Sequence, residues 1–188
     1  MTDAVLSSRP LYRGWLNLIM LRLRLGQVEC ERAIVEHVSG ATVLAYDPER
    51  RVAMTVRQTR DAVLYLDAAP FPEAIAGVTE NEDPAETARR EAYEEAGLRL
   101  TDIEPVGHVW MTPSTTTERV HLFLAAYQAA DRTGAGGGVA DELETIDARE
   151  EPLADLWTAA VGGAIGDAKL FMLLHALRLR RPELFDRA

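Results

Sequence analysis

The chain has 188 residues and a formal net charge of −10, from 30 acidic and 20 basic side chains. A chain this acidic is a poor candidate for binding the phosphate backbone of nucleic acids, so we expect no nucleic-acid partner. A few arginines and a metal ion can still bind a phosphate compound locally. Hydrophobic residues make up 47% of the chain, which is enough to build a core and excludes wholesale disorder.

Cysteine content and apolar stretches bear on location. Cys30 is the only cysteine, so neither an intramolecular disulfide nor a zinc ribbon can form. The longest apolar stretch, GWLNLIMLRLRLG, contains Arg22 and Arg24 and is too short to span a bilayer. The opening MTDAVLSSRP lacks the basic and apolar segments of a signal peptide. We therefore expect a cytoplasmic protein that does not associate with membranes.

Alternating patterns predict β-strands in two parts of the chain. Residues 15–25 have mainly apolar side chains at odd positions, and a second strand follows at 27–40 after a hairpin-type junction. Residues 41–47 and 51–60 form a predicted hairpin. Two later strands flank a loop rich in Pro, Ser and Thr at 112–117.

Helical periodicity appears at 84–96, at 152–161 and at 167–181. In the last of these helices the expected amphipathic stripe consists of Leu170, Phe171, Leu174, Leu177 and Arg178. The run GAGGG at 134–138 is predicted to be a flexible loop. Strands, a helix, more strands and two further helices together predict an α+β fold with a mixed β-sheet sandwiched between helices.

The helix at 84–96 has clear start and stop signals. Asp83 can cap its N-terminus, Pro84 suits the first helical position, and Glu86 can complete a capping box. Gly97 fits the position just beyond the C-terminus. The spacing of Arg90 predicts ion pairs with Glu86 and Glu94, each four residues away.

Three carboxylates on this helix, Glu91, Glu94 and Glu95, fall within one arc of about 100° because they are three and four residues apart. Like charges at this spacing destabilise a helix, and its C-terminal end disfavours anions as well. A bound divalent cation would offset both effects. Carboxylate ligands without nearby Cys or His favour Mg²⁺, with Mn²⁺ as a substitute, and Mg²⁺ in turn favours phosphate ligands.

These residues resemble the signature of the Nudix hydrolases, G-x5-E-x7-R-E-U-x-E-E-x-G-U, where U is apolar. REAYEEAGL, at 90–98, matches every fixed position of its second half, and Glu82 lies at the correct distance upstream. Gly77 lies one residue too close to Glu82, so the turn between them is shorter than the signature asks.

Other segments resemble the branch of that family that acts on nucleoside diphosphate-sugars. VRQTR at 56–60 is similar to the Arg-Gln-x-Arg strand of ADP-ribose pyrophosphatases, and PEAIAG at 72–77 to the strand that leads into their signature. AGGGVADE at 135–142 and ERVHLFLAAY at 118–127 are similar to segments of GDP-mannose pyrophosphatases.

The resemblance implies a role for each matching residue. The metal ligands would be Glu91, Glu94, Glu95 and the backbone carbonyl of Ala76, with Glu82 as an accessory. Arg90 would orient the glutamates, and Arg57 and Arg60 would contact the diphosphate. Glu142 is the candidate general base, with Asp141 and Glu144 as alternatives.

The implied activity is the Mg²⁺-dependent hydrolysis of a nucleoside diphosphate-sugar, of the GDP-mannose or ADP-ribose type, to a nucleoside monophosphate and a sugar phosphate. Residues 1–38 would form an N-terminal antiparallel β extension that builds a homodimer, and 39–188 the hydrolase domain. The alternative is a catalytically silent Nudix-fold sensor or interaction module. Such a module is expected to lose some of the glutamates, and all of them are present here.

Overall fold

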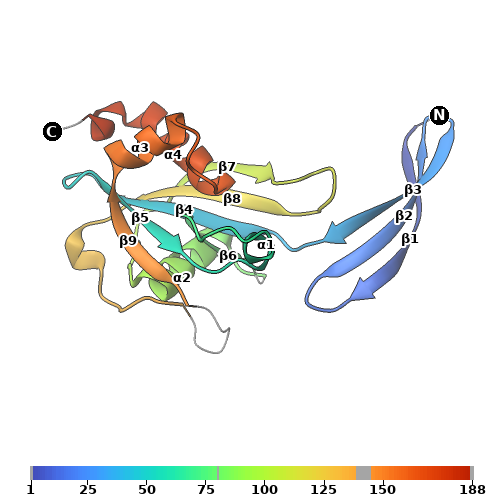
Figure 1. The fold of residues 1–188 in the computed structure, drawn as a ribbon, viewed down its shortest axis with the longest axis horizontal. Coiled ribbons are helices and arrows are strands. Elements are labelled where there is room, and N and C mark those ends of the chain that lie inside the picture. Colours follow the sequence, from blue (N-terminus) through green and yellow to red (C-terminus); the bar gives the residue numbers. More distant parts are fainter. Residues whose placement is uncertain (1, 80, 139–144, 187–188) are drawn as a thin grey trace. The chain divides into compact units, whose positions relative to one another are not determined.

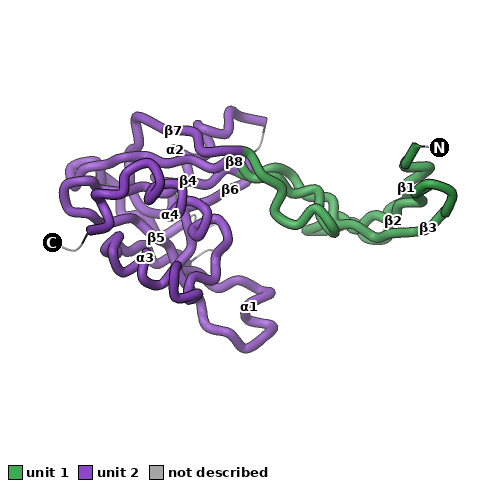
Figure 2. The backbone as a smooth tube through the Cα atoms, turned by 90° about the horizontal axis from the view of Figure 1, so that it is seen from above, with its two compact units in different colours: residues 1–40, 108–120 green, residues 41–107, 121–188 purple. Residues whose placement is uncertain are grey.

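The computed structural model describes residues 2–79, 81–138 and 145–186. The chain forms two compact units (Figure 2). The first contains residues 1–40 and 108–120, and the second contains residues 41–107 and 121–188. In the described part of the chain, no helix combines the length and the apolar character that crossing a membrane requires.

The first unit is built on a three-stranded antiparallel sheet with the order β1 (Ala4–Arg13), β2 (Asn17–Leu25) and β3 (Val28–Glu36). Strands β2 and β3 pair without a register shift up to Leu25 and Val28. Gly26, at φ 63°, supplies the left-handed residue that so tight a turn needs. The predicted N-terminal antiparallel extension is therefore confirmed, and β1 is a strand that the pattern analysis did not locate.

The second unit contains most of a six-stranded sheet in the order β7-β8-β4-β5-β9, with β6 paired to β4. Figure 1 shows α2 on one face of this sheet and α3 and α4 on the other. The predicted α+β fold with a sheet between helices is thus confirmed. The elements of this part of the chain are β4 (Gly40–Asp47), β5 (Val52–Arg57), α1 (Asp61–Tyr65), β6 (Ile75–Val78), α2 (Pro84–Ala96), β7 (Glu104–Trp110), β8 (Arg119–Ala126), η1 (Ala129–Asp131), β9 (Asp147–Pro152), α3 (Leu153–Val161), α4 (Ala168–Arg180) and η3 (Pro182–Phe185).

The core under α2 uses the small side chains of that helix. Ala88, Ala92 and Ala96 are fully buried and share one cluster with sheet residues such as Val43 and Ile75. Alanine leaves little distance between the helix and the sheet, so the backbone of α2 lies close to β6. This close packing brings the polar faces of α2 next to the segment that enters the helix from β6.

The opposite face of the sheet is covered by leucines of α3 and α4. In α4 the buried residues are Leu170, Leu173, Leu174 and Leu177. The predicted stripe is therefore wrong at one position, because Phe171 is 40% exposed and Leu173 is buried in its place. Phe171 instead packs against the ring of His175 on the outer side of the helix, with 4.2 Å between ring centroids.

Candidate functional site

The ends of helix α2 are set by local chemistry. The Asp83 carboxylate accepts a hydrogen bond from the Ala85 N–H at 2.8 Å, as predicted for the cap. Gly97 adopts φ 69° just beyond the helix, and its N–H donates to the Tyr93 carbonyl at 2.9 Å. The predicted pair between Glu86 and Arg90 is wrong: Glu86 contacts Arg89 at 2.5 Å, because Arg90 is turned toward other carboxylates.

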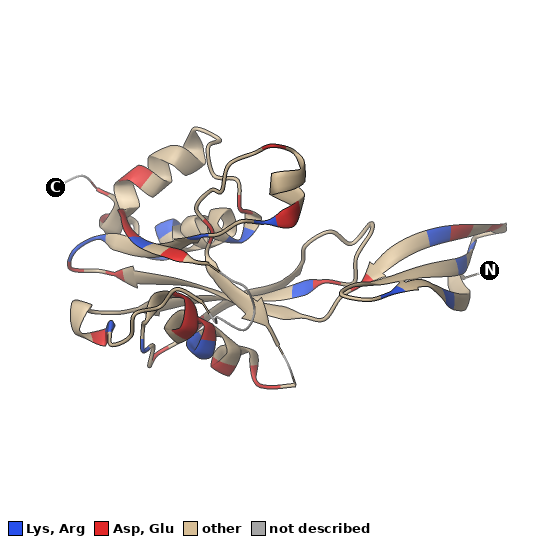
Figure 3. Cartoon of the chain, turned by 60° about the horizontal axis from the view of Figure 1, so that its bottom comes forward, with Lys and Arg blue, Asp and Glu red and all other residues tan. Residues whose placement is uncertain are grey.

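Arg90 connects the carboxylates of the site. Its Nη1 atom lies 2.8 Å from Glu94 Oε2, which confirms the predicted pair, and 2.8 Å from Glu91 Oε1. On its other side it donates to Glu82 Oε1 from Nε and Nη2, at 3.2 and 3.1 Å. Acidic and basic residues consequently adjoin one another along α2 (Figure 3). Burial lowers the pKa of Arg90, but its carboxylate neighbours raise that pKa above its ordinary value, so the guanidinium stays charged.

The segment that leads from β6 into α2 lies directly against Glu91. A Cβ added to Gly77 would lie 1.8 Å from Glu91 Oε1 and 2.1 Å from its Cδ. Only glycine leaves room for the carboxylate at this point, and the reason is space, since its φ is not positive. The Glu91 carboxylate thus lies beside the Cα of Gly77, the residue that follows Ala76.

The donor set suits a hard divalent cation. Glu91 and Glu94 contact the same Arg90 nitrogen, so their carboxylates lie side by side, and Glu95, on the same helix, is only 3% exposed. All donors are oxygens, as Mg²⁺ prefers. Within residues 2–79, 81–138 and 145–186, no three Asp, Glu, His or Cys side chains already form a metal site. Here the Arg90 guanidinium provides the positive charge between Glu91 and Glu94, and metal ligation by the glutamates and the Ala76 carbonyl stays a prediction.

The two arginines predicted to bind the diphosphate are both paired with carboxylates. Arg60 donates to Glu73 from Nη2 at 2.8 Å and from Nε at 3.1 Å to each carboxylate oxygen. Arg57, at the end of β5, contacts Glu151 of β9 at 2.5 Å through Nη2, while its buried Nη1 has no hydrogen-bond partner among the described residues. Their contact with phosphate stays a prediction, and the unpartnered Nη1 of Arg57 is buried in the structure as it stands.

The glycine run at 134–138 is docked on the C-terminal end of α2, which corrects the prediction of a flexible loop. The N–H groups of Gly137 and Gly138 donate to the carbonyls of Glu95 and Glu94 at 2.9 and 3.1 Å. The Gly134 N–H donates to the Gly97 carbonyl at 3.1 Å. Glycine is needed at 136, where φ is 66° and an added Cβ would lie 2.6 Å from the Glu95 carbonyl oxygen. The run therefore satisfies the free carbonyls that a helix C-terminus leaves.

Gly136→Ala should destabilise the protein by more than left-handed strain alone, because its Cβ meets backbone atoms of α2 that cannot move independently. The matched control is Gly163→Ala, where φ is 74° and an added Cβ meets nothing within 4 Å. We expect the control to cost about 1–2 kcal/mol of unfolding free energy, and Gly136→Ala at least about 1 kcal/mol more. Urea unfolding measures both, and equal costs would contradict the docking.

The candidate general base Glu142 and its alternatives Asp141 and Glu144 lie outside the described residues, so their assignment stays a prediction. The described chain stops at Gly138, beside the Glu94 carbonyl, and resumes at residue 145. Ile146 then donates from its N–H to the Gly137 carbonyl at 3.2 Å. Gly138 and Ile146, which flank the candidate residues in the chain, are thus both held near the C-terminal end of α2, where Glu94 lies.

Several known proteins are similar to this chain over most of its length. A family described as the NUDIX domain matches residues 36–174. A GDP-mannose pyrophosphatase of Cronobacter sakazakii is 36% identical over 156 residues, which cover 81% of this chain and 80% of the relative. A GDP-mannose pyrophosphatase of Citrobacter koseri is 34% identical over 149 residues, covering 78% and 77%. A crystal structure of an ADP compounds hydrolase has a TM-score of 0.77 at 16% identity, covers 97% of this chain and 96% of its own, and supports the fold.

Proposed function

Because this chain belongs to the Nudix hydrolase family and is a pyrophosphohydrolase, we propose that it cleaves the diphosphate linkage of a nucleoside diphosphate-sugar, with GDP-mannose as the leading substrate and ADP-ribose as its rival. The observation that carries the proposal is the arrangement of Glu91 and Glu94 around Arg90 Nη1, next to the Gly77 backbone. The shared name of the relatives favours GDP-mannose.

In this proposal Glu91, Glu94, Glu95 and the Ala76 carbonyl hold Mg²⁺ or Mn²⁺. The bound cation would offset the charge of the diphosphate and lower the pKa of the attacking water. Arg90 keeps the glutamates in place through its contacts with Glu94 and Glu82. A divalent cation held beside Glu91 would supply part of the positive charge that the Arg90 guanidinium now provides between Glu91 and Glu94.

The bond changes follow from the products. A carboxylate of segment 141–144, Glu142 by prediction, accepts a proton from water while the water oxygen attacks one phosphorus. The bond from that phosphorus to the bridging oxygen breaks, and the other phosphate leaves with the bridging oxygen. Arg57 and Arg60 would offset the negative charge that develops on the phosphate oxygens. The products are a nucleoside monophosphate and a sugar phosphate.

The test is phosphate-coupled hydrolysis of a panel of nucleoside diphosphate-sugars, with Mg²⁺, with Mn²⁺ and with a chelator. We expect turnover that requires a divalent cation and a higher kcat/KM for GDP-mannose than for ADP-ribose. A higher kcat/KM for ADP-ribose would overturn the choice of GDP-mannose as the leading substrate, but it would still support hydrolysis of a nucleoside diphosphate-sugar. No turnover of any member would overturn the proposal and favour a silent nucleotide-sugar sensor.

We also propose that the protein is a homodimer assembled through its first unit. Described residues of that unit leave large apolar side chains in water: Trp15 is 91% exposed, Val28 64% and Val5 62%. Large apolar side chains that a small unit leaves exposed are typical of an interface with another chain. Light scattering during size exclusion should give twice the chain mass of 20.7 kDa, and Trp15→Glu should shift the protein toward monomer. A wild-type monomer at micromolar concentration would contradict this proposal.

A further inference from the structure

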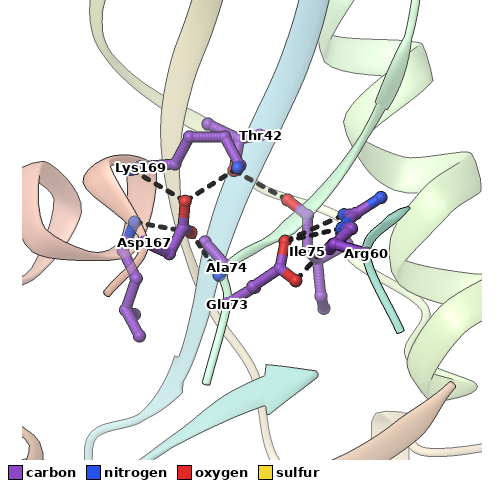
Figure 4. A network of polar contacts seen from close by, with 8 residues as sticks. Thr42, Arg60, Glu73, Ala74, Ile75, Asp167 and Lys169 are labelled. Atoms are coloured by element: carbon purple, nitrogen blue, oxygen red, sulfur yellow. Dashed lines mark hydrogen bonds and ion pairs between the residues drawn. The ribbon is translucent and has the colours of Figure 1, made fainter. Parts of the chain in front are cut away.

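The backbone just before the signature turn is held by side chains from two distant parts of the chain (Figure 4). The Ala74 N–H donates to Asp167 Oδ2 at 3.0 Å, and the hydroxyl of Thr42 donates to the Ile75 carbonyl at 2.8 Å. Ala74 is 1% exposed, Ile75 and Thr42 are fully buried, and Asp167 is 6% exposed. Hydrogen bonds in such a dry environment are costly to lose, because water does not replace the missing partner.

Asp167 is shared between this segment and helix α4. The same Oδ2 atom accepts the Leu170 N–H at 3.0 Å, which caps α4, while Oδ1 accepts from Lys169 Nζ at 2.8 Å. A charged acceptor makes each of these bonds stronger than its neutral equivalent. One carboxylate therefore fixes the position of Ala74 relative to the start of a helix whose leucines are anchored in the core.

The held residues are one step from the candidate metal site. Ala76, whose carbonyl is a predicted ligand, directly follows Ile75, and the Gly77 backbone lies against the Glu91 carboxylate. The strand itself is short: β6 has four residues and pairs with β4, and just before it Glu73 and Val56 exchange two backbone hydrogen bonds of 3.0 and 2.8 Å. A shift of a few tenths of an ångström at Ala74 or Ile75 would move both the Ala76 carbonyl and the wall that confines Glu91.

We propose that Thr42 and Asp167 are positioning residues that hold the segment 74–77 so that the Ala76 carbonyl and Glu91 are presented to the same cation. Neither residue touches the reacting atoms, and both act through backbone hydrogen bonds. The inference rests on the proposed function for its catalytic meaning. Its structural content, ordering of the segment 74–77, is independent of any substrate.

The test for Thr42 uses Thr42→Val, which keeps the side-chain volume and removes the donor, and Thr42→Ser, which restores the donor. The matched control is Thr55→Val on the neighbouring strand, since Thr55 is equally buried and its hydroxyl points to the Arg149 carbonyl of β9. Mn²⁺ affinity is measured by paramagnetic titration without substrate, and hydrogen exchange is followed at the amides of 74–77. We expect Thr42→Val to weaken Mn²⁺ binding and lower kcat about 10- to 100-fold, with faster exchange and KM within about twofold.

Thr42→Ser should lie close to wild type, and Thr55→Val should leave Mn²⁺ affinity unchanged. Equal Mn²⁺ affinity in Thr42→Val and Thr55→Val would overturn the inference. A wild type that hydrolyses no nucleotide-sugar would defeat the proposed function alone, because Mn²⁺ titration and amide exchange still decide the positioning role.

Asp167→Ser provides a second test that does not depend on Thr42. A serine hydroxyl can still cap α4 by accepting from Leu170, but it is too short and has too few acceptors to hold Ala74 as well. We expect the same loss of Mn²⁺ affinity and the same faster exchange at 74–77, with the helix content unchanged in circular dichroism. Wild-type Mn²⁺ affinity in a folded Asp167→Ser variant would equally overturn the inference.

Discussion

Replacing Glu94 and Glu95 together by glutamine should reduce hydrolysis of the nucleotide-sugar by about three orders of magnitude or more. The change removes two negative charges from the proposed metal face without changing side-chain shape. A bound divalent cation supplies several kcal/mol of charge stabilisation in the transition state, and each 1.36 kcal/mol corresponds to about tenfold in rate. Steady-state kinetics over a range of Mg²⁺ concentrations would measure the loss.

The fold should survive this double substitution. Glu94 loses its ion pair with Arg90, but that pair is partly exposed and contributes less than about 1 kcal/mol. Removing adjacent like charges on α2 offsets part of this loss. Glu86→Gln is the matched control, because Glu86 lies on the same helix, is exposed and, within the described part of the chain, pairs with Arg89 and not with Arg90. Wild-type turnover in the double variant would remove these glutamates from the mechanism, whereas lost turnover in the control would point to a general effect of charge.

The sequence predicts helix α2 well because its signals are local. Asp83 caps the first turn and Gly97 takes a left-handed conformation just past the last, and both depend on neighbours within four residues. The choice of partner for Arg90 could not be read from helical spacing alone. Glu82 precedes the helix, yet it competes with Glu86 for the guanidinium and leaves Glu86 to Arg89.

Two other failures have tertiary causes. β9 reads DAREEP, with four charged residues and a proline, so neither its composition nor its periodicity indicates a strand. It becomes a strand because it pairs antiparallel with β5 over its whole length, from Arg57↔Asp147 to Val52↔Pro152, while Arg50 neutralises Glu150. The glycine run at 134–138 likewise looks flexible in isolation, because its binding partners are carbonyls at the end of α2.

Thr42 and Asp167 could not be found from the sequence either. Each reads as an ordinary polar residue, one inside an apolar strand and the other before a helix. Both bind the segment 74–77 from far away in the chain: Thr42 is 33 residues from its partner Ile75, and Asp167 is 93 residues from its partner Ala74. No local sequence pattern predicts a hydrogen bond between residues so far apart. Glu91, Glu94 and Glu95 could be identified from the sequence because they are spaced three and four residues apart on one helix.

Gly77→Ala should separate catalysis from folding. The added Cβ would lie 1.8 Å from Glu91 Oε1, so one of the two must move. The atoms that the added Cβ meets, Cγ, Cδ and Oε1, all belong to the flexible Glu91 side chain and none to the backbone, and position 77 has no positive φ, so the side chain can turn away without backbone strain. We expect kcat/KM and Mn²⁺ affinity to fall about 10- to 100-fold, the loss typical of disturbed metal sites, while unfolding free energy changes by less than about 1 kcal/mol.

Gly107→Ala on β7 is the control, because an added Cβ there meets nothing within 4 Å and its φ is not positive either. Both variants add one methyl group to a glycine without left-handed strain, so they differ only in what that methyl group meets. A loss of Mn²⁺ affinity confined to Gly77→Ala would assign the effect to Glu91. Wild-type Mn²⁺ affinity in Gly77→Ala would instead mean that Glu91 does not need its position beside Gly77 to bind metal. The segment 74–77 would then have to present the Ala76 carbonyl to a cation without the close contact to Glu91 seen here.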